Sequence, residues 1–225
     1  DGAMNYYGFA MPVRAFLASV DHRRQRVCVD AEDFARMLAR ARAPQPFDDQ
    51  LSQFNLLGSH DTARFLSVAG DRSLVKLAVT LLFTYVGVPC VYYGDEVGLA
   101  GEEDPDCRRA FPWDEAAWDR DLLVHYRRLI ALRRSSMALQ QGAFIELHAR
   151  RDVYAFARQL AGETVVVVVN RGNATRVELP VWKAGLWSEV LRPLVGDEPH
   201  GLRQGVLELD LPARAGAVFC VREPG

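Results

Sequence analysis

The sequence predicts a mixed fold in which an α/β part is followed by an all-β part. In the first part, short apolar segments that end in glycine alternate with stretches of helical periodicity, which is typical of a parallel sheet covered by helices. From about Ser135, strand-like runs separated by Gly, Asn, Asp and Pro follow one another, as in a β-sandwich of roughly ninety residues. We therefore expect two domains, residues 1–134 and 135–225.

Three helices are predicted in the first part. The first lies in "AEDFARMLARARAP", where prolines follow the last apolar position and prevent the helix from continuing. The second covers Arg72 to Tyr85, with Asp71 placed to cap its first turn. The third runs from about Arg120 to Arg134.

Two strands are predicted between these helices. The segments "LSQFNLLGS" and "GVPCVYYG" are mostly apolar and bounded by glycines, which indicates strands buried on both faces. The 24 residues "DEVGLAGEEDPDCRRAFPWDEAAW" after the second strand exceed the usual length of a connection, so they form a candidate functional loop. In the second part, "NRGN" between two strand-like runs predicts a hairpin.

Composition excludes several classes of protein. The net charge of −2 argues against a nucleic-acid binder, and no apolar run approaches the ~20 residues that cross a bilayer. The four cysteines are scattered, which favours a reducing compartment and a cytoplasmic protein. The chain begins without an initiator Met or a signal peptide, so we expect it to start inside a larger protein.

The first candidate site is the pair His60 and Asp61, at the end of the first predicted strand. In α/β domains, catalytic side chains gather where strands end, because the strand fixes their position and the loop exposes them. Local spacing leaves an alternative open: Ser59 and Asp61 cap a helical turn, and His60 is a buried hydrogen-bonding residue.

The second predicted strand ends in Tyr92 and Tyr93, followed by Asp95 and Glu96. Aromatic rings pack on the apolar face of a pyranose and carboxylates accept bonds from its hydroxyls, so this group is suited to a sugar. The alternative is a turn with solvated acidic residues.

The long loop brings Asp104 and Arg108 four residues apart, as a polar-ligand fork or as a surface ion pair. The same loop lacks the alternating ligands of an EF-hand, and the chain has no phosphate-binding glycine motif, so we predict neither a metal nor a cofactor. Histidines and tryptophans elsewhere are expected to be surface or packing residues: His22, His125, His148, His200, Trp118, Trp182 and Trp187.

Four motifs in order, "DGAMNY", "FNLLGSHDTAR", "GVPCVYYGDEVGLAG" and "DPDCRRAFPWDE", resemble the C-terminal half of an α-amylase superfamily glycoside hydrolase. The most similar branch is that of maltodextrin glucosidases, neopullulanases and cyclomaltodextrinases. The resemblance implies that residues 1–134 are the end of a (β/α)8 TIM barrel, about strands six to eight, and that residues 135–225 are the β-sandwich that follows it.

The resemblance also implies roles and partners. Asp61 matches the transition-state-stabilising acid, while His60, Asp104 and Arg108 match substrate-binding residues. Tyr92 and Glu96 are expected to line the same pocket. The implied reaction is retaining hydrolysis of α-1,4-glucosidic bonds in maltodextrins or related α-glucans.

In this family the nucleophilic Asp and the acid Glu stand on the fourth and fifth strands, which are absent from this chain. We therefore expect the chain to be inactive alone and to need the N-terminal half of the same enzyme as its partner; homodimer formation is compatible with the sequence. The rival interpretation is a non-catalytic carbohydrate-binding or structural module.

Overall fold

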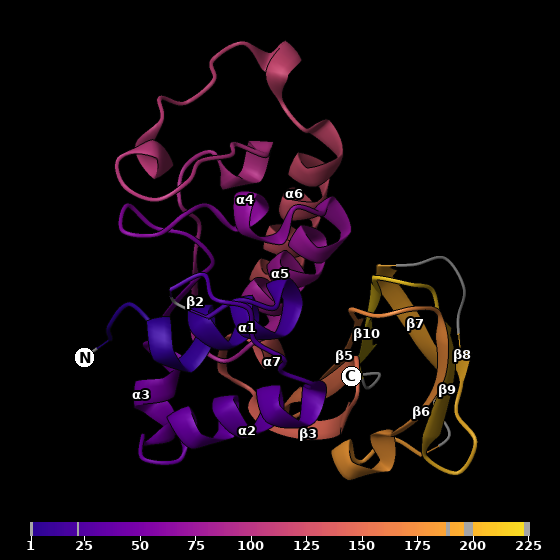
Figure 1. The fold of residues 1–225 in the computed structure, drawn as a ribbon. Helices are drawn as coiled ribbons and strands as arrows, with labels where there is room; N and C mark the ends of the chain where they lie inside the picture. The colour runs from indigo at the N-terminus through magenta and orange to yellow at the C-terminus, as the bar shows by residue number, and fades with distance from the viewer. Residues whose placement is uncertain (1, 22, 188–189, 196–199, 223–225) are drawn as a thin grey trace. The chain divides into compact units, whose positions relative to one another are not determined.

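The computed structural model describes residues 2–21, 23–187, 190–195 and 200–222 (Figure 1). The chain divides into two compact units. The first consists of Asp1–Phe83 and Gly87–Ala131, and the second of Thr84–Val86 and Leu132–Gly225. Within the described residues, no helix has the length and apolar character required to span a membrane.

The first unit contains a short parallel sheet. Strand β1 (Phe54–Leu56) pairs in parallel with β2 (Val88–Cys90). On the other side of β1, Met4 forms a parallel bridge to Phe54. Two helices, α4 (Phe65–Ala69) and α5 (Arg72–Thr84), connect β1 to β2, which makes a βαβ crossover.

The predicted helices are confirmed, and their ends follow local capping rules. Helix α2 (Ala31–Arg42) starts at Asp30, whose carboxylate accepts a bond from the Asp33 N–H at 2.8 Å. Asp71 accepts from the Ser73 N–H at 2.7 Å at the start of α5. The third predicted helix is α6 (Arg120–Ser135).

Further helical segments of the first unit come from residues for which no helix was predicted. They are the π-helical turn η1 (Tyr6–Ala10), α1 (Met11–Ala18) and α3 (Phe47–Leu51). Short 3-10 turns interrupt the long loop: η2 (Asp95–Val97), η3 (Asp106–Arg108) and η4 (Glu115–Ala117).

The prediction that both strands are buried on both faces holds for Asn55 and Leu56 of β1, which are 0% and 1% exposed, but is wrong for the start of β1 and for β2. Leu51 ends α3 rather than starting a strand, Phe54 of β1 is 46% exposed and Val88 of β2 is 40% exposed. The physical reason is that the described sheet is narrow, so side chains on these strands lack neighbours to cover them.

The second unit is built from antiparallel strands. A six-stranded sheet has the order β3-β4-β5-β10-β7-β8, and a separate pair joins β6 to β9. The six strands of the large sheet are, in that order, Ala143–Arg150, Val153–Leu160, Glu163–Asn170, Ala215–Arg222, Val190–Val195 and His200–Gly201. Strands β6 and β9 are Thr175–Pro180 and Val206–Leu211, and α7 (Met137–Gln141) and the 3-10 turn η5 (Val181–Ala184) complete the unit.

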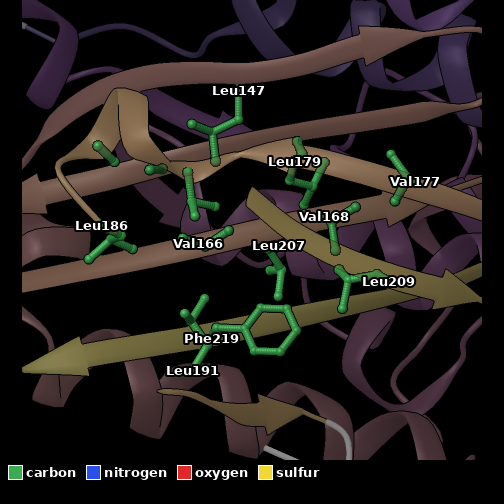
Figure 2. Close-up of a cluster of buried hydrophobic side chains, with 14 of the residues drawn as sticks. Leu147, Val166, Val168, Val177, Leu179, Leu186, Leu191, Leu207, Leu209 and Phe219 are labelled. Carbon is green, nitrogen blue, oxygen red and sulfur yellow. The ribbon is translucent and has the colours of Figure 1, made fainter. Parts of the chain in front are cut away.

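One hydrophobic cluster joins the two sheets of the second unit. Figure 2 shows Val166, Val168 and Phe219 of the large sheet on the same cluster as Leu179 and Leu207 of the β6–β9 pair. Each of these five side chains is at most 1% exposed. Alternate residues of the strands therefore supply a shared core, as the period of two requires.

The predicted hairpin at "NRGN" is wrong. Strand β5 pairs with β4 and β10, whereas β6 pairs with β9, so residues 171–174 cross from one sheet to the other. The Asn170 carboxamide donates to the Asn173 carbonyl at 2.8 Å and to the Pro212 carbonyl at 2.9 Å, which fixes this crossing. Antiparallel pairs of consecutive strands occur instead at β3–β4, at β7–β8 and at β4–β5, where Ala161 and Gly162 make the turn.

Candidate active site

His60 and Asp61 lie at the exit of β1 and are open to solvent. Their side chains are 58% and 59% exposed, with His60 Nε2 3.3 Å from Asp61 Oδ1. The next helix begins only at Phe65 and has no side-chain cap. The alternative in which Asp61 caps a helix and His60 is buried is therefore wrong.

The backbone turn that carries this pair is held from the side of η1 and α1. The buried Arg14 guanidinium donates to the Leu57 carbonyl at 2.8 Å and to the Ala63 carbonyl at 2.5 Å, at the two ends of the turn. Burial lowers the pKa of Arg14 to about 10. Tyr6 donates its hydroxyl proton to Ser59 Oγ at 2.8 Å, and the same oxygen accepts from the Asp61 backbone N–H at 3.1 Å.

A second buried guanidinium, that of Arg64, lies beneath the exit of β2. Its Nη1 donates to the Tyr93 carbonyl at 2.6 Å and to Asp95 Oδ1 at 2.9 Å, and its Nε donates to the Cys107 carbonyl at 3.1 Å. The guanidinium carbon is 4.5 Å and 4.8 Å from the ring centroids of Tyr92 and Tyr93. This geometry is that of a cation–π contact on both rings.

The Asp95 carboxylate is an unusual feature of the first unit. Burial raises its pKa to about 6, although the neighbouring Arg64 opposes that rise. A Cβ at Gly58 would lie 3.1 Å from Asp95 Oδ2, so any larger residue there would require the carboxylate to shift by a few tenths of an ångström.

The long loop returns to the β1 exit. Arg108 Nη2 is 2.9 Å from Asp104 Oδ2, and Arg108 Nε donates to the His60 carbonyl at 3.1 Å. Cys107 Sγ donates to the same carbonyl at 3.2 Å. The predicted fork and the predicted strand-exit pair are thus in direct contact.

Asp61 and Asp104 line one cavity of about 440 Å³ in the first unit. Its other walls come from η1, α1, β1 and the loops around them: Tyr6, Ala10, Met11, Arg14, Arg24, Leu56, Leu57, Thr62, Ala63 and Glu103. A cavity of this size, lined by carboxylates and by apolar residues, can enclose one or two sugar rings.

Tyr92, Glu96, His60 and Arg108 are not among the described residues that line this cavity; of the predicted site residues, only Asp61 and Asp104 line it. Tyr92 packs on the Arg64 guanidinium, and burial together with a bond to Tyr93 raises its pKa to about 12. Glu96 lies in the turn η2, and its Oε2 is buried without a partner among the described residues.

Sequence reasoning missed Arg14 and Arg64 as residues that hold the site. Both look like ordinary surface arginines in the sequence, and their partners are 29 to 49 positions away along the chain. The adjacency of Arg64 to the "SHDTA" motif was the one available signal.

Other candidate residues lie apart from this cavity. Within the described ranges, no group of three His, Cys, Asp or Glu side chains could hold a metal ion. His125 is partly buried against Thr80 and the Lys76 carbonyl, and burial lowers its pKa; His22 lies outside the described residues. Trp182 and Trp187, predicted to be packing residues, are 45% and 57% exposed, so packing accounts for only part of each ring.

The parallel β1–β2 pair, its helical crossover and the polar residues at the strand exits define an α/β fold, and the match to the alpha-amylase catalytic domain and to solved structures of such enzymes makes it TIM-barrel-derived. The chain belongs to the alpha-amylase family: the profile of the alpha amylase catalytic domain matches residues 1–121.

Individual relatives carry this similarity over most of the chain. A neopullulanase 2 of Thermoactinomyces vulgaris is 39% identical over 97% of this chain, and a cyclomaltodextrinase of a Bacillus species is 46% identical over 64% of it. The crystal structure of the debranching enzyme of Nostoc punctiforme superposes with a TM-score of 0.84 at 37% identity, covering 97% of this chain. The chain spans only 36%, 26% and 47% of these proteins, respectively.

Proposed function

We propose that this chain is the C-terminal part of a retaining glycosidase that hydrolyses α-1,4-glucosidic bonds of maltodextrins. In this proposal the Met4 segment, β1 and β2 are strands six to eight of a (β/α)8 barrel. Residues 1–134 are the end of the catalytic domain, and residues 135–225 are its β-sandwich. Family membership and the names of the α-glucan-acting relatives support the substrate class.

One observation carries the proposal. Asp61 and Asp104, which are far apart in the sequence, line a single cavity, and the Arg108 bond to the His60 carbonyl joins the two segments that carry them. An oligosaccharide in this cavity would have one ring beside Asp61 and a further ring beside Asp104. Two contact points along one groove fit a chain of linked sugars better than a single small ligand.

The proposed chemistry assigns Asp61 to the transition state. A carboxylate near the sugar hydroxyls and the anomeric carbon stabilises the positive charge that develops as the glycosidic bond breaks. His60 donates a hydrogen bond to a hydroxyl of the same ring. The nucleophilic Asp and the acid Glu come from the segment that the longer relatives have in addition, so residues 1–225 alone are proposed to be inactive.

The test is Asp61→Asn in the full-length protein that contains this chain. Loss of one transition-state contact lowers kcat on maltotriose by about 10³-fold, while the thermal unfolding midpoint stays unchanged. Asp48→Asn, at an exposed position of α3, is the matched control and leaves kcat unchanged. Near-wild-type turnover by Asp61→Asn would refute the role given to this residue.

The rival function is a non-catalytic carbohydrate-binding module. It predicts that the full-length protein binds maltotriose without releasing glucose or maltose, and that Asp61→Asn changes only the binding constant. Product analysis of the wild-type protein separates the two functions. A cytoplasmic location stays a prediction from the cysteine pattern of the sequence.

A further inference from the structure

Arg64 connects three segments of the first unit, although none of its side chain is exposed. Its side chain donates to the Tyr93 carbonyl and the Asp95 carboxylate at the β2 exit, and to the Cys107 carbonyl in the long loop. Its backbone N–H donates to the Gly101 carbonyl at 2.9 Å, six residues before Cys107 in the same loop. One residue therefore fixes the loop at two points.

These bonds close a ring around the candidate site. Arg64 follows Asp61 by three residues in the β1 exit turn, and Cys107 and Arg108 both donate to the His60 carbonyl. The route from the turn to Arg64, to the Cys107 carbonyl and back to the His60 carbonyl runs through direct contacts only. A displacement of the guanidinium would therefore change the spacing between the two sugar contacts.

Stability alone is a weak reason for this arrangement. A buried ion pair loses solvation energy that its Coulomb attraction often fails to recover, and apolar side chains of similar volume are commonly as stable. Moreover, Arg64 Nη2 has no acceptor within the described part of the chain. The bonds to the Cys107 and Gly101 carbonyls go to the loop that carries Asp104 and Arg108, so orientation of that loop is the benefit that remains.

We propose that Arg64 is a positioning residue that holds Asp61 and His60 at a fixed spacing from Asp104 and Arg108. It acts through those residues, because its guanidinium is buried and does not reach the cavity. This inference rests on the proposed function. It adds that the planar, forked shape of the guanidinium, and not only its charge, is required for turnover.

The test uses Arg64→Lys and Arg64→Met in the full-length protein. Lysine keeps the charge beside Asp95 but cannot direct separate N–H groups to the β2 exit and to the Cys107 carbonyl at once. We expect Arg64→Lys to lower kcat on maltotriose by about 10- to 100-fold, because misplacement of a reacting group by about 1 Å has effects of that size. Arg120→Lys is the matched control, since Arg120 also has an ion pair and an aromatic contact but lies outside the site; its kcat stays within about 2-fold of wild type.

The decisive measurement is a double-variant cycle with Asp61→Asn, read on an aryl α-maltoside with a good leaving group. If Arg64 acts through Asp61, adding Arg64→Lys to Asp61→Asn changes the residual rate by less than about 2-fold. A purely structural role lowers the active fraction and reduces the rate by the same factor in both backgrounds, which would overturn the inference. Wild-type kinetics of Arg64→Lys would overturn it as well.

Two outcomes keep this inference separate from the proposed function. Should Arg64→Met fail to fold, Arg64→Lys and the cycle still decide the question. Should the wild-type protein release no product from maltotriose, the proposed function fails and this inference fails with it. Suppose that the wild type is active and Asp61→Asn is impaired. If Arg64→Lys then lowers the rate by the same factor in both backgrounds, the positioning role of Arg64 is rejected while the proposed function stands.

Discussion

The buried carboxylate of Asp95 predicts a pH dependence of stability that is opposite to that of most acidic residues. Burial raises its pKa from 3.8 to about 6, and the charges that act on it are Arg64, Arg14 and Glu96. The folded protein thus binds this proton more tightly than the unfolded chain does. The contribution is fully favourable below about pH 4, and it is lost as the pH rises through about 6.

The size of the effect follows from the difference between the two pKa values. A change from 3.8 to about 6 corresponds to about 3 kcal/mol of folding free energy in total, of which about 2 kcal/mol is lost between pH 4 and 7. Asp95→Asn removes the titration while it keeps the shape of the side chain. The variant has its own cost, because Arg64 loses its counter-charge, but that cost is almost independent of pH in this range.

The assay is thermal unfolding of the full-length wild type and of Asp95→Asn at constant ionic strength from pH 4 to 7.5. We expect the wild type to lose about 2 kcal/mol relative to the variant as the pH rises, a change of several degrees in the difference between their midpoints. Asp48→Asn, which alters an exposed acid, should follow the wild type. The raised pKa of Asp95 would be refuted if the difference in unfolding midpoint between wild type and Asp95→Asn stayed constant with pH. It would also be refuted if the wild type became more stable relative to the variant as the pH rose.

Two further predictions concern the long loop and the core of the second unit. Arg108→Ala removes the ion pair with Asp104 and one bond to the His60 carbonyl. We therefore expect a several-fold rise in KM for maltopentaose and little change in KM for maltose. KM values that vary with substrate length as in the wild type would contradict this role. Phe219→Ala leaves a cavity in the cluster of Figure 2 and should cost about 3–5 kcal/mol in denaturant unfolding, whereas the exposed Val190→Ala should cost less than about 0.5 kcal/mol; equal losses would show that Phe219 is not packed as described.

Local signals in the sequence predicted the helices well. Helices α2, α5 and α6 each carry an apolar stripe of helical period, and the acidic residue before α5 caps it as expected. These features depend on neighbours within a few positions, so they can be found without a structure. The strands were less predictable, because their burial depends on how many other strands lie beside them.

The sequence did not show which distant segments pair as strands or contact each other through side chains. The segment after Asn170 has the turn residues of a hairpin, but β6 pairs with β9 instead, about thirty residues further on. In the candidate site, Asp61 and Asp104 could be located from strand ends and from family resemblance. The contact between Arg64 and Asp95 could not, because nothing in either local pattern indicates the other residue.

The crossing after Asn170 has a practical consequence for protein engineering. Because one carboxamide joins three places in the chain, residues 171–174 are a poor position for an inserted peptide or label. The two-residue turn between β4 and β5 offers the opposite case. Ala161 and Gly162 are exposed, and because the φ of +79° at Gly162 disfavours a side chain there, Ala161 is the place to attach a fluorophore or to lengthen the chain.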